Sequence, residues 1–126
     1  LQNHDQALSI VRSFGFKVVE FSGMPLNEQI STANKSSILA GVHGAGLAHV
    51  IAQQKGSQLF EIFGPTYVNP CFFELALNSG ILYHFMVNDN LNVDKILSRN
   101  YRDLSFEINL KRLESYLADI VIAPCR

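Results

Sequence analysis

The sequence has almost no excess of charge, and this excludes one broad class of function. Its 126 residues include 10 Lys and Arg against 11 Asp and Glu, which gives a net charge of −1. The basic residues are scattered along the chain, whereas a nucleic-acid surface needs a basic stripe or patch. We therefore expect no nucleic-acid partner.

Long apolar runs and paired cysteines are also missing. No run approaches the roughly 18 apolar residues that a membrane-spanning helix needs. The two cysteines, Cys71 and Cys125, lie far apart and belong to no C-x-x-C or Cys/His zinc pattern. We interpret them as small buried side chains, although a disulfide between them remains open in an oxidising compartment.

The motifs of two enzyme classes are absent as well. There is no G-x-S-x-G, which removes the α/β-hydrolases from consideration. There is no D-x-D metal motif either, and the nearest match, Asn88-Asp89-Asn90, is interpreted as a solvated turn. We expect neither a metal ion nor another cofactor.

The sequence does contain a globular pattern of alternating strands and helices. Apolar residues make up 48% and charged residues 17%, which is the balance of a folded domain rather than of a disordered chain. Strands are expected over residues 16–21, 37–41, 58–63 and 81–86, with a weaker candidate over 104–108. Helices are expected over 5–14, 25–36, 44–53, 69–79 and 110–121, with the 69–79 helix largely buried and a polar loop over 88–102.

This alternation predicts an α/β fold, namely a Rossmann-like parallel sheet with helices on both faces. Because no repeat or linker interrupts the pattern, residues 1–126 are expected to form a single domain. A parallel α/β layer normally opens with a strand, but this chain opens with a helix. We therefore expect the domain to be the C-terminal part of a longer protein.

The most informative stretch is Gly41-Val42-His43-Gly44-Ala45-Gly46-Leu47, which leads from a predicted strand into a predicted helix. Small residues there let another group approach the backbone closely, and the free N–H groups of a new helix favour a negative charge. The stretch therefore predicts a phosphate or diphosphate site with His43 beside it. Its spacing does not meet the dinucleotide-binding fingerprint, and tight turns also use glycine for packing alone, so both interpretations stay open.

Glu61 lies near the end of the next predicted strand. In an open parallel sheet, ligands bind outside the carboxyl ends of the strands, so Glu61 and the glycine turn should share one edge. A nucleotide-sugar site needs a diphosphate at a helix start and a carboxylate that accepts hydrogen bonds from ribose hydroxyls. We therefore count Glu61 among the candidate binding residues.

The other histidines and Cys71 are weaker candidates. His49 is interpreted as a surface or packing residue, and His4 and His84 have no partners at metal-ligand spacing. Cys71 lies at a predicted helix start, where a thiolate would be stabilised, but no neighbouring histidine is identifiable and we assign it a structural role. Packing is also the default assignment for three tyrosines, Tyr67, Tyr83 and Tyr101.

Two segments resemble a known family. Residues 37–47, which contain His43-Gly44-Ala45-Gly46, and residues 56–65 look like the hallmark of the family 61 glycosyltransferases. Weaker matches lie at residues 14–19, 29–34, 73–76 and 80–83. The resemblance thus runs from about residue 8 to residue 86, and its specific part is the glycine turn.

The resemblance implies a GT-B architecture, in which two Rossmann-like domains hold the active site between them. Members transfer a sugar, typically GlcNAc or xylose, from a UDP donor to a glycan or polysaccharide acceptor, with inversion and without a metal. This chain would correspond to the donor-binding C-terminal domain, so the N-terminal domain of the same protein would be a further partner. The donor diphosphate would be lined by His43, Gly44, Ala45, Gly46 and Leu47, and Glu61 would lie near the ribose.

His43 is the one candidate catalytic residue. We expect it to contact the donor or the leaving group, although it could also act as the base or simply hydrogen-bond the turn. No other side chain is a convincing base. Two alternatives to a glycosyltransferase therefore stay open: a non-catalytic Rossmann-like interaction domain, and an enzyme that acts on another phosphorylated ligand.

The predicted location depends on the source of the protein. A bacterial member of the family would work in the cytoplasm on surface polysaccharide. A eukaryotic member would work in the lumen of the ER or Golgi, where Cys71 and Cys125 can be oxidised.

Overall fold

The computed structural model describes residues 1–88 and 106–122, and these divide into two compact units. One unit contains Leu1–Val18, Phe63–Val68 and the described residues of Met86–Ala123. The other contains Val19–Ile62 and Asn69–Phe85. The glycine turn and Glu61 both belong to the second unit, which is therefore the one that matters for the site.

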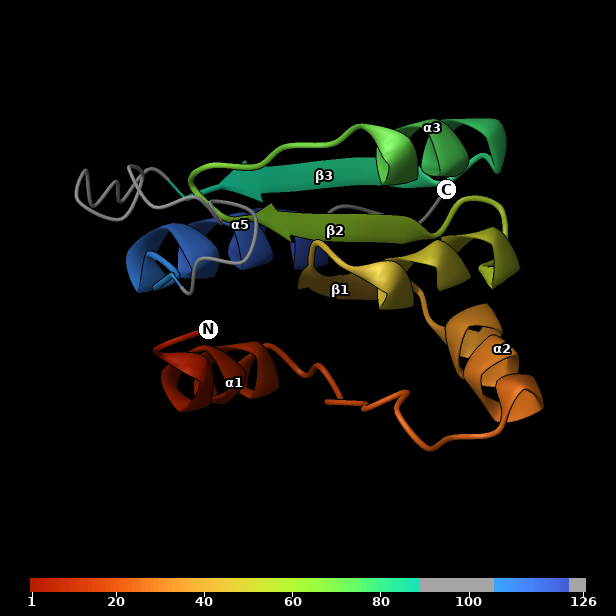
Figure 1. The fold of residues 1–126 in the computed structure, drawn as a ribbon, viewed down its shortest axis with the longest axis horizontal. Helices are drawn as coiled ribbons and strands as arrows, with labels where there is room; N and C mark the ends of the chain where they lie inside the picture. The colour runs from red at the N-terminus through yellow and green to blue at the C-terminus, as the bar shows by residue number, and fades with distance from the viewer. Residues whose placement is uncertain (89–105, 123–126) are drawn as a thin grey trace. The chain divides into compact units, whose positions relative to one another are not determined.

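Three parallel strands form the sheet, in the order β1 (Ile38–Val42), β2 (Gln58–Phe63) and β3 (Leu82–Val87) (Figure 1). The ladder between β1 and β2 is parallel and sets Gly41 opposite Glu61. The N–H of Leu82 donates to the carbonyl of Ser57 at 2.9 Å, so β3 starts beside the start of β2. The α/β class with a parallel sheet, which the sequence predicts, is confirmed.

The strand β2 lies at the centre of the sheet, and all six of its residues are buried. Four of the six are large apolar residues, as a strand covered on both faces favours, and the other two are the buried Gln58 and Glu61. One face of the sheet packs against η1 (Ala45–Ala52) and α3 (Cys71–Asn78), which also contact each other. The core on this face consists of Leu47, Val50, Leu59, Phe72, Ala76 and Ile81.

The helix predicted over residues 44–53 is a 3-10 helix rather than an α-helix. Gly46 in its first turn lowers the preference for a regular α-helix. The side chain of His49 also bonds back to the carbonyl of Gly46, with 2.9 Å between Nδ1 and the oxygen. The α2 helix (Leu26–Lys35) packs on η1. Its Ala33 is fully buried, whereas Leu26 and Ile30 are exposed.

The predicted strand over residues 16–21 is wrong. The segment has no strand pairing within the described part of the chain, and Val18 and Val19 are exposed. Its β-branched composition favours extended backbone, but a strand also needs a neighbour that takes its hydrogen bonds. The carbonyl of Phe21 is instead taken by a turn, in which the N–H of Met24 and the side chain of Gln29 both donate to it.

The expectation that the 69–79 helix is largely buried holds for only one face of it. In α3, Phe72 and Ala76 are buried, whereas Phe73 and Leu77 are 42% and 66% exposed. The weak strand candidate over 104–108 is not confirmed where it can be seen, because residues 106–108 form no strand and residues 104–105 lie outside the described residues.

In the first unit, α1 (His4–Ser13) packs against α5 (Leu110–Ile122). Asn109 caps α5, since its Oδ1 accepts from the N–H of Arg112 at 3.1 Å. Asn88 is fully buried and donates from Nδ2 to the carbonyl of Phe63 at 3.0 Å. The solvated turn predicted there is therefore wrong at Asn88, while Asp89, Asn90 and the rest of the 88–102 loop lie outside the described residues.

Candidate functional site

The glycine turn follows the carboxyl end of β1, where the sequence places it. β1 ends at Val42, His43 and Gly44 form the turn, and η1 begins at Ala45. Gly44 has φ 174° and ψ 170°, which is an extended backbone that any residue adopts. The turn therefore does not need glycine at residue 44 for its backbone conformation.

The space around the glycines distinguishes Gly41 from the other two. A Cβ on Gly41 would lie 3.2 Å from Cδ2 of Leu47, so packing against η1 favours glycine there. A Cβ on Gly44 would meet nothing closer than the carbonyl oxygen of Val42 at 3.6 Å, and one on Gly46 nothing closer than Phe21 at 3.6 Å. Those are ordinary van der Waals distances, so the fold itself leaves room at Gly44 and Gly46 for another group.

The backbone N–H groups of the turn point to the kind of group that could use this room. The N–H of His43 donates to the carbonyl of Ile62 at 2.8 Å, and that of Leu47 donates to Gly44 at 3.0 Å. Within the described residues, no such bond engages the N–H groups of Gly44, Ala45 or Gly46. Unengaged N–H groups at a helix start are donors for an anion.

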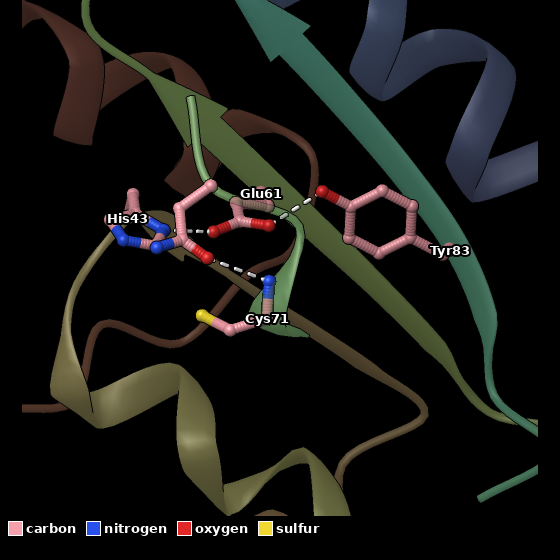
Figure 2. A network of polar contacts seen from close by, with 5 residues as sticks. His43, Glu61, Cys71 and Tyr83 are labelled. Carbon is pink, nitrogen blue, oxygen red and sulfur yellow. Dashed lines mark hydrogen bonds and ion pairs between the residues drawn. The ribbon is translucent and has the colours of Figure 1, made fainter. Parts of the chain in front are cut away.

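Beside the turn, three side chains form one hydrogen-bonded chain (Figure 2). Nδ1 of His43 contacts Oε1 of Glu61 in a short hydrogen bond, which is also an ion pair whenever the imidazole is protonated. The hydroxyl of Tyr83 donates to Oε2 of Glu61 at 2.5 Å. Glu61 is completely buried, whereas the side chain of His43 keeps 19% of its surface exposed. A ligand can therefore reach His43 but not Glu61.

The sheet register brings these three residues together. Side chains alternate between the two faces of a strand, so Glu61 shares the face of Leu59 in the core and Tyr83 shares the face of Ile81. Opposite Glu61 in β1 is Gly41, which has no side chain to occupy the space. The His43 ring packs 5.2 Å from that of Phe72, measured between ring centroids.

The electrostatics of these three hydrogen-bonded side chains follow from the burial of Glu61. A buried carboxylate is stable only when its oxygens are paired and hydrogen-bonded. An ionised carboxylate only accepts hydrogen bonds, so Nδ1 of His43 is the donor in the bond to Glu61. Burial, followed by the bond to Glu61, raises the pKa of Tyr83 well above its ordinary value, so this side chain remains a neutral donor.

The structure brings Glu61 to the same edge as His43, but in an unexpected setting. The sequence predicts that Glu61 accepts hydrogen bonds from ribose hydroxyls, yet both of its oxygens are already bonded inside the protein. A ribose contact would have to replace one of these bonds, and the contact stays a prediction. Sequence reasoning missed Tyr83 as the second partner, although its alternation with Ile81 on β3 places it on the core face.

The other candidate residues lie outside the hydrogen-bonded chain of His43, Glu61 and Tyr83, or have structural roles. His49 stacks at 4.6 Å on Phe21, as a packing residue does. His84 bonds the buried Gln58 on the opposite face of the sheet, with 2.8 Å between Nε2 and Oε1, and burial lowers the pKa of His84. Cys71 is a free thiol at the start of α3, and Cys125 lies outside the described residues.

The described residues contain neither a group of metal ligands nor a membrane-spanning helix. Among residues 1–88 and 106–122, no three His, Cys, Asp or Glu side chains are grouped as a metal site would require. No helix in the same ranges is both long and apolar enough to cross a membrane.

A second concave surface lies at the other end of the strands. A pocket of about 240 Å³ opens before β1 and β2 and is lined by polar residues that include Lys35, Ser36, Lys55 and Ser57. It contains none of the residues of the glycine turn. It therefore provides a useful comparison, because an anion attracted only by lysine charge would collect there.

Comparison with known proteins points to one family. Residues 1–60, just under half of the chain, match the sequence model of glycosyltransferase 61. This part of the chain is therefore similar to the glycosyltransferase 61 family. The family 61 resemblance stated from the sequence is confirmed, and the matched range includes both the glycine turn and the first part of β2.

The relatives that this chain matches are named glycosyltransferases. An EGF domain-specific O-linked N-acetylglucosamine transferase of Xenopus laevis is 36% identical over 62% of this chain. A beta-1,2-xylosyltransferase of Arabidopsis thaliana is 32% identical over 50% of it. The matches cover 15% and 12% of the length of these two relatives. No solved structure matches the chain.

These relatives confirm the predicted enzyme class at the level of the family, which is that of glycosyltransferases. They come from eukaryotes, as does a third relative from Drosophila melanogaster that is 27% identical over 64% of the chain. They agree with the eukaryotic alternative for location and give no support to the bacterial cytoplasm.

Proposed function

We propose that His43–Leu47 binds the diphosphate of a UDP-sugar, and that the protein transfers this sugar to a glycan acceptor with inversion and without a metal. One observation carries the proposal. At the carboxyl edge of a parallel sheet, Gly44 and Gly46 leave space that the fold does not use, beside unengaged N–H groups and a reachable histidine. This is the environment that a diphosphate needs.

The chemistry follows from where charge develops. In an inverting transfer, a general base takes the proton of the acceptor hydroxyl, and the acceptor oxygen forms a bond to the anomeric carbon as the bond from that carbon to the diphosphate breaks. The departing UDP gains negative charge, which backbone N–H groups and a protonated imidazole stabilise. His43 is held for this role by Glu61, whose buried carboxylate accepts from Nδ1 and so orients the ring.

The wider setting is also part of the proposal. The names of the relatives make N-acetylglucosamine and xylose the first donor sugars to test. A second Rossmann-like domain of a GT-B enzyme would bring the acceptor, which could be a protein-linked glycan or a polysaccharide. For a eukaryotic protein, the compartment would be the ER or Golgi lumen.

Isothermal titration of UDP tests the donor site through Gly44→Ala. The added methyl fits the empty turn at 3.6 Å from Val42, so the melting temperature should be unchanged, but it occupies the space that the diphosphate needs. We expect UDP to bind at least tenfold more weakly, which corresponds to about 1.4 kcal/mol.

The matched control is Lys55→Gln, which removes a cation from the pocket at the other end of the strands. It should bind UDP as the wild type does. The donor-site assignment fails if the folded wild-type protein does not bind UDP, or if Gly44→Ala binds it equally well. A thermal-shift panel that favours a bare sugar phosphate over uridine nucleotides would instead support an enzyme of another phosphorylated ligand.

A further inference from the structure

We infer that Tyr83 is a positioning residue for His43, and that it acts through the buried carboxylate of Glu61. The inference rests on the proposed function in one respect, since it takes His43 to be the proton-bearing group of the donor site. The observation behind it is the continuous chain of hydrogen bonds from the β3 hydroxyl through the β2 carboxylate to the imidazole (Figure 2).

The orientation of the Glu61 carboxylate depends on both of its hydrogen-bond donors. Its terminal torsion is broad in the absence of partners, and the carboxylate has no contact with solvent that could fix it. The two donors bind different oxygens, so together they fix the plane of the carboxylate. If the Tyr83 hydroxyl were removed, only the bond to His43 itself would hold Glu61.

The orientation of Tyr83 depends on its aromatic neighbours. Its ring lies between two other aromatic rings, with centroid distances of 5.3 Å to Phe73 and 5.9 Å to Phe85. Edge-to-face and stacked contacts of this kind hold a ring in place. The hydroxyl is therefore presented to Glu61 from a fixed support, and the ring contacts do not depend on the hydroxyl.

The Tyr83 hydroxyl also affects the negative charge of Glu61. A hydrogen bond from Tyr83 stabilises the negative charge of Glu61 and so reduces the attraction of this carboxylate for the proton on His43. Loss of the hydroxyl should make His43 hold its proton more tightly, whereas loss of the carboxylate charge should make His43 release it more easily. The two changes act in opposite directions, although both break the same chain.

Titratable groups surround the hydrogen-bonded side chains, and they come from β2, β3, α3 and η1. Glu61 belongs to β2, Tyr83 to β3 and Cys71 to the start of α3, where it is an electrostatic neighbour of Tyr83. η1 contributes His49, whose ring packs on Phe21. Among these groups, Glu61 is the one bonded to both His43 and Tyr83, so it is the route by which Tyr83 affects the imidazole.

The test is an NMR titration of the His43 ring in the whole protein, with its signals assigned by comparison with His43→Gln. In Tyr83→Phe, which keeps the ring and removes only the hydroxyl, the midpoint should rise by about half a pH unit or more. In Glu61→Gln the midpoint should fall. Tyr116→Phe on α5, in the other unit, is the matched control and should leave the midpoint unchanged.

A second measurement avoids any effect of substitution on folding. Incorporation of 3-fluorotyrosine keeps the Tyr83 hydroxyl and makes it a stronger donor, so the His43 midpoint should fall. The inference is overturned if Tyr83→Phe titrates like the wild type or below it, or if the fluorinated protein does not titrate below it. Because this readout requires neither UDP nor activity, its failure is distinguishable from failure of UDP binding, which would overturn the proposed function instead.

Discussion

Glu61→Ala is expected to lower the free energy of unfolding by about 2–4 kcal/mol, because it leaves hydrogen-bond donors without their acceptor and removes a buried side chain. The substitution leaves His43 without its carboxylate partner and the hydroxyl of Tyr83 without its acceptor. It also opens a cavity between η1, α3 and the sheet, in a site that is completely buried. Urea unfolding at neutral pH measures the effect.

Two controls separate this effect from a general loss of a carboxylate. Glu61→Gln keeps the shape and one acceptor oxygen, so it should lose clearly less stability than Glu61→Ala. Glu20→Ala removes an exposed carboxylate and should leave the unfolding midpoint unchanged. A Glu61→Ala protein as stable as Glu20→Ala would show that the chain of hydrogen bonds contributes nothing to the fold.

His43→Asn is expected to lower the rate of sugar transfer by the full native protein at least a hundredfold. Removal of one group that stabilises developing negative charge typically has an effect of about this size. Asparagine is chosen because its side-chain N–H can still donate toward Glu61, which protects the buried carboxylate better than alanine would. The loss should therefore appear mainly in kcat, with the fold intact by circular dichroism.

The matched control for His43→Asn is His49→Asn. His49 is a half-buried histidine on η1 whose ring contacts that of Phe21 at a tilt, and it lies outside the hydrogen-bonded chain formed with Glu61. It should retain nearly full activity. If His43→Asn kept more than a tenth of the wild-type rate, His43 would have no role in the chemical step and the structural interpretation of this residue would stand.

The elements that the sequence predicts well are those with a local cause. The sequence predicts β2 at residues 58–63 and it is found there, because a short segment rich in aromatic and branched apolar residues after a turn is typical of a buried strand. α5 begins after Asn109 because its side chain caps the first turn. By contrast, residues 16–21 have the composition of a strand but no partner, and pairing cannot be deduced from one segment alone.

In the site, too, some features follow from the local sequence and others depend on contacts between distant segments. The position of His43 beside the glycine turn follows from chain order, and so does the placement of Glu61 at the same edge. The partner of Glu61 does not, because Tyr83 reaches it only through the adjacency of β2 and β3. A carboxylate within the apolar run of β2 was nevertheless a signal, since a buried carboxylate must have partners.

The structure distinguishes the three glycines of the turn by the space around each of them. From the sequence, packing and ligand binding were equally good reasons for its three glycines. In the structure, Gly41 has a packing reason, whereas Gly44 and Gly46 have none among the described residues. The functional interpretation therefore rests on two particular positions rather than on the motif as a whole.

The most direct test of the diphosphate site is an amide NMR titration of the ¹⁵N-labelled protein with UDP. The largest shifts should fall on Gly44, Ala45 and Gly46, whose N–H groups are unengaged, and on His43 and Leu47 beside them. Shifts confined to the pocket around Lys35 and Lys55, or no shift at the turn at saturating UDP, would contradict the assignment of His43–Leu47 as the donor site.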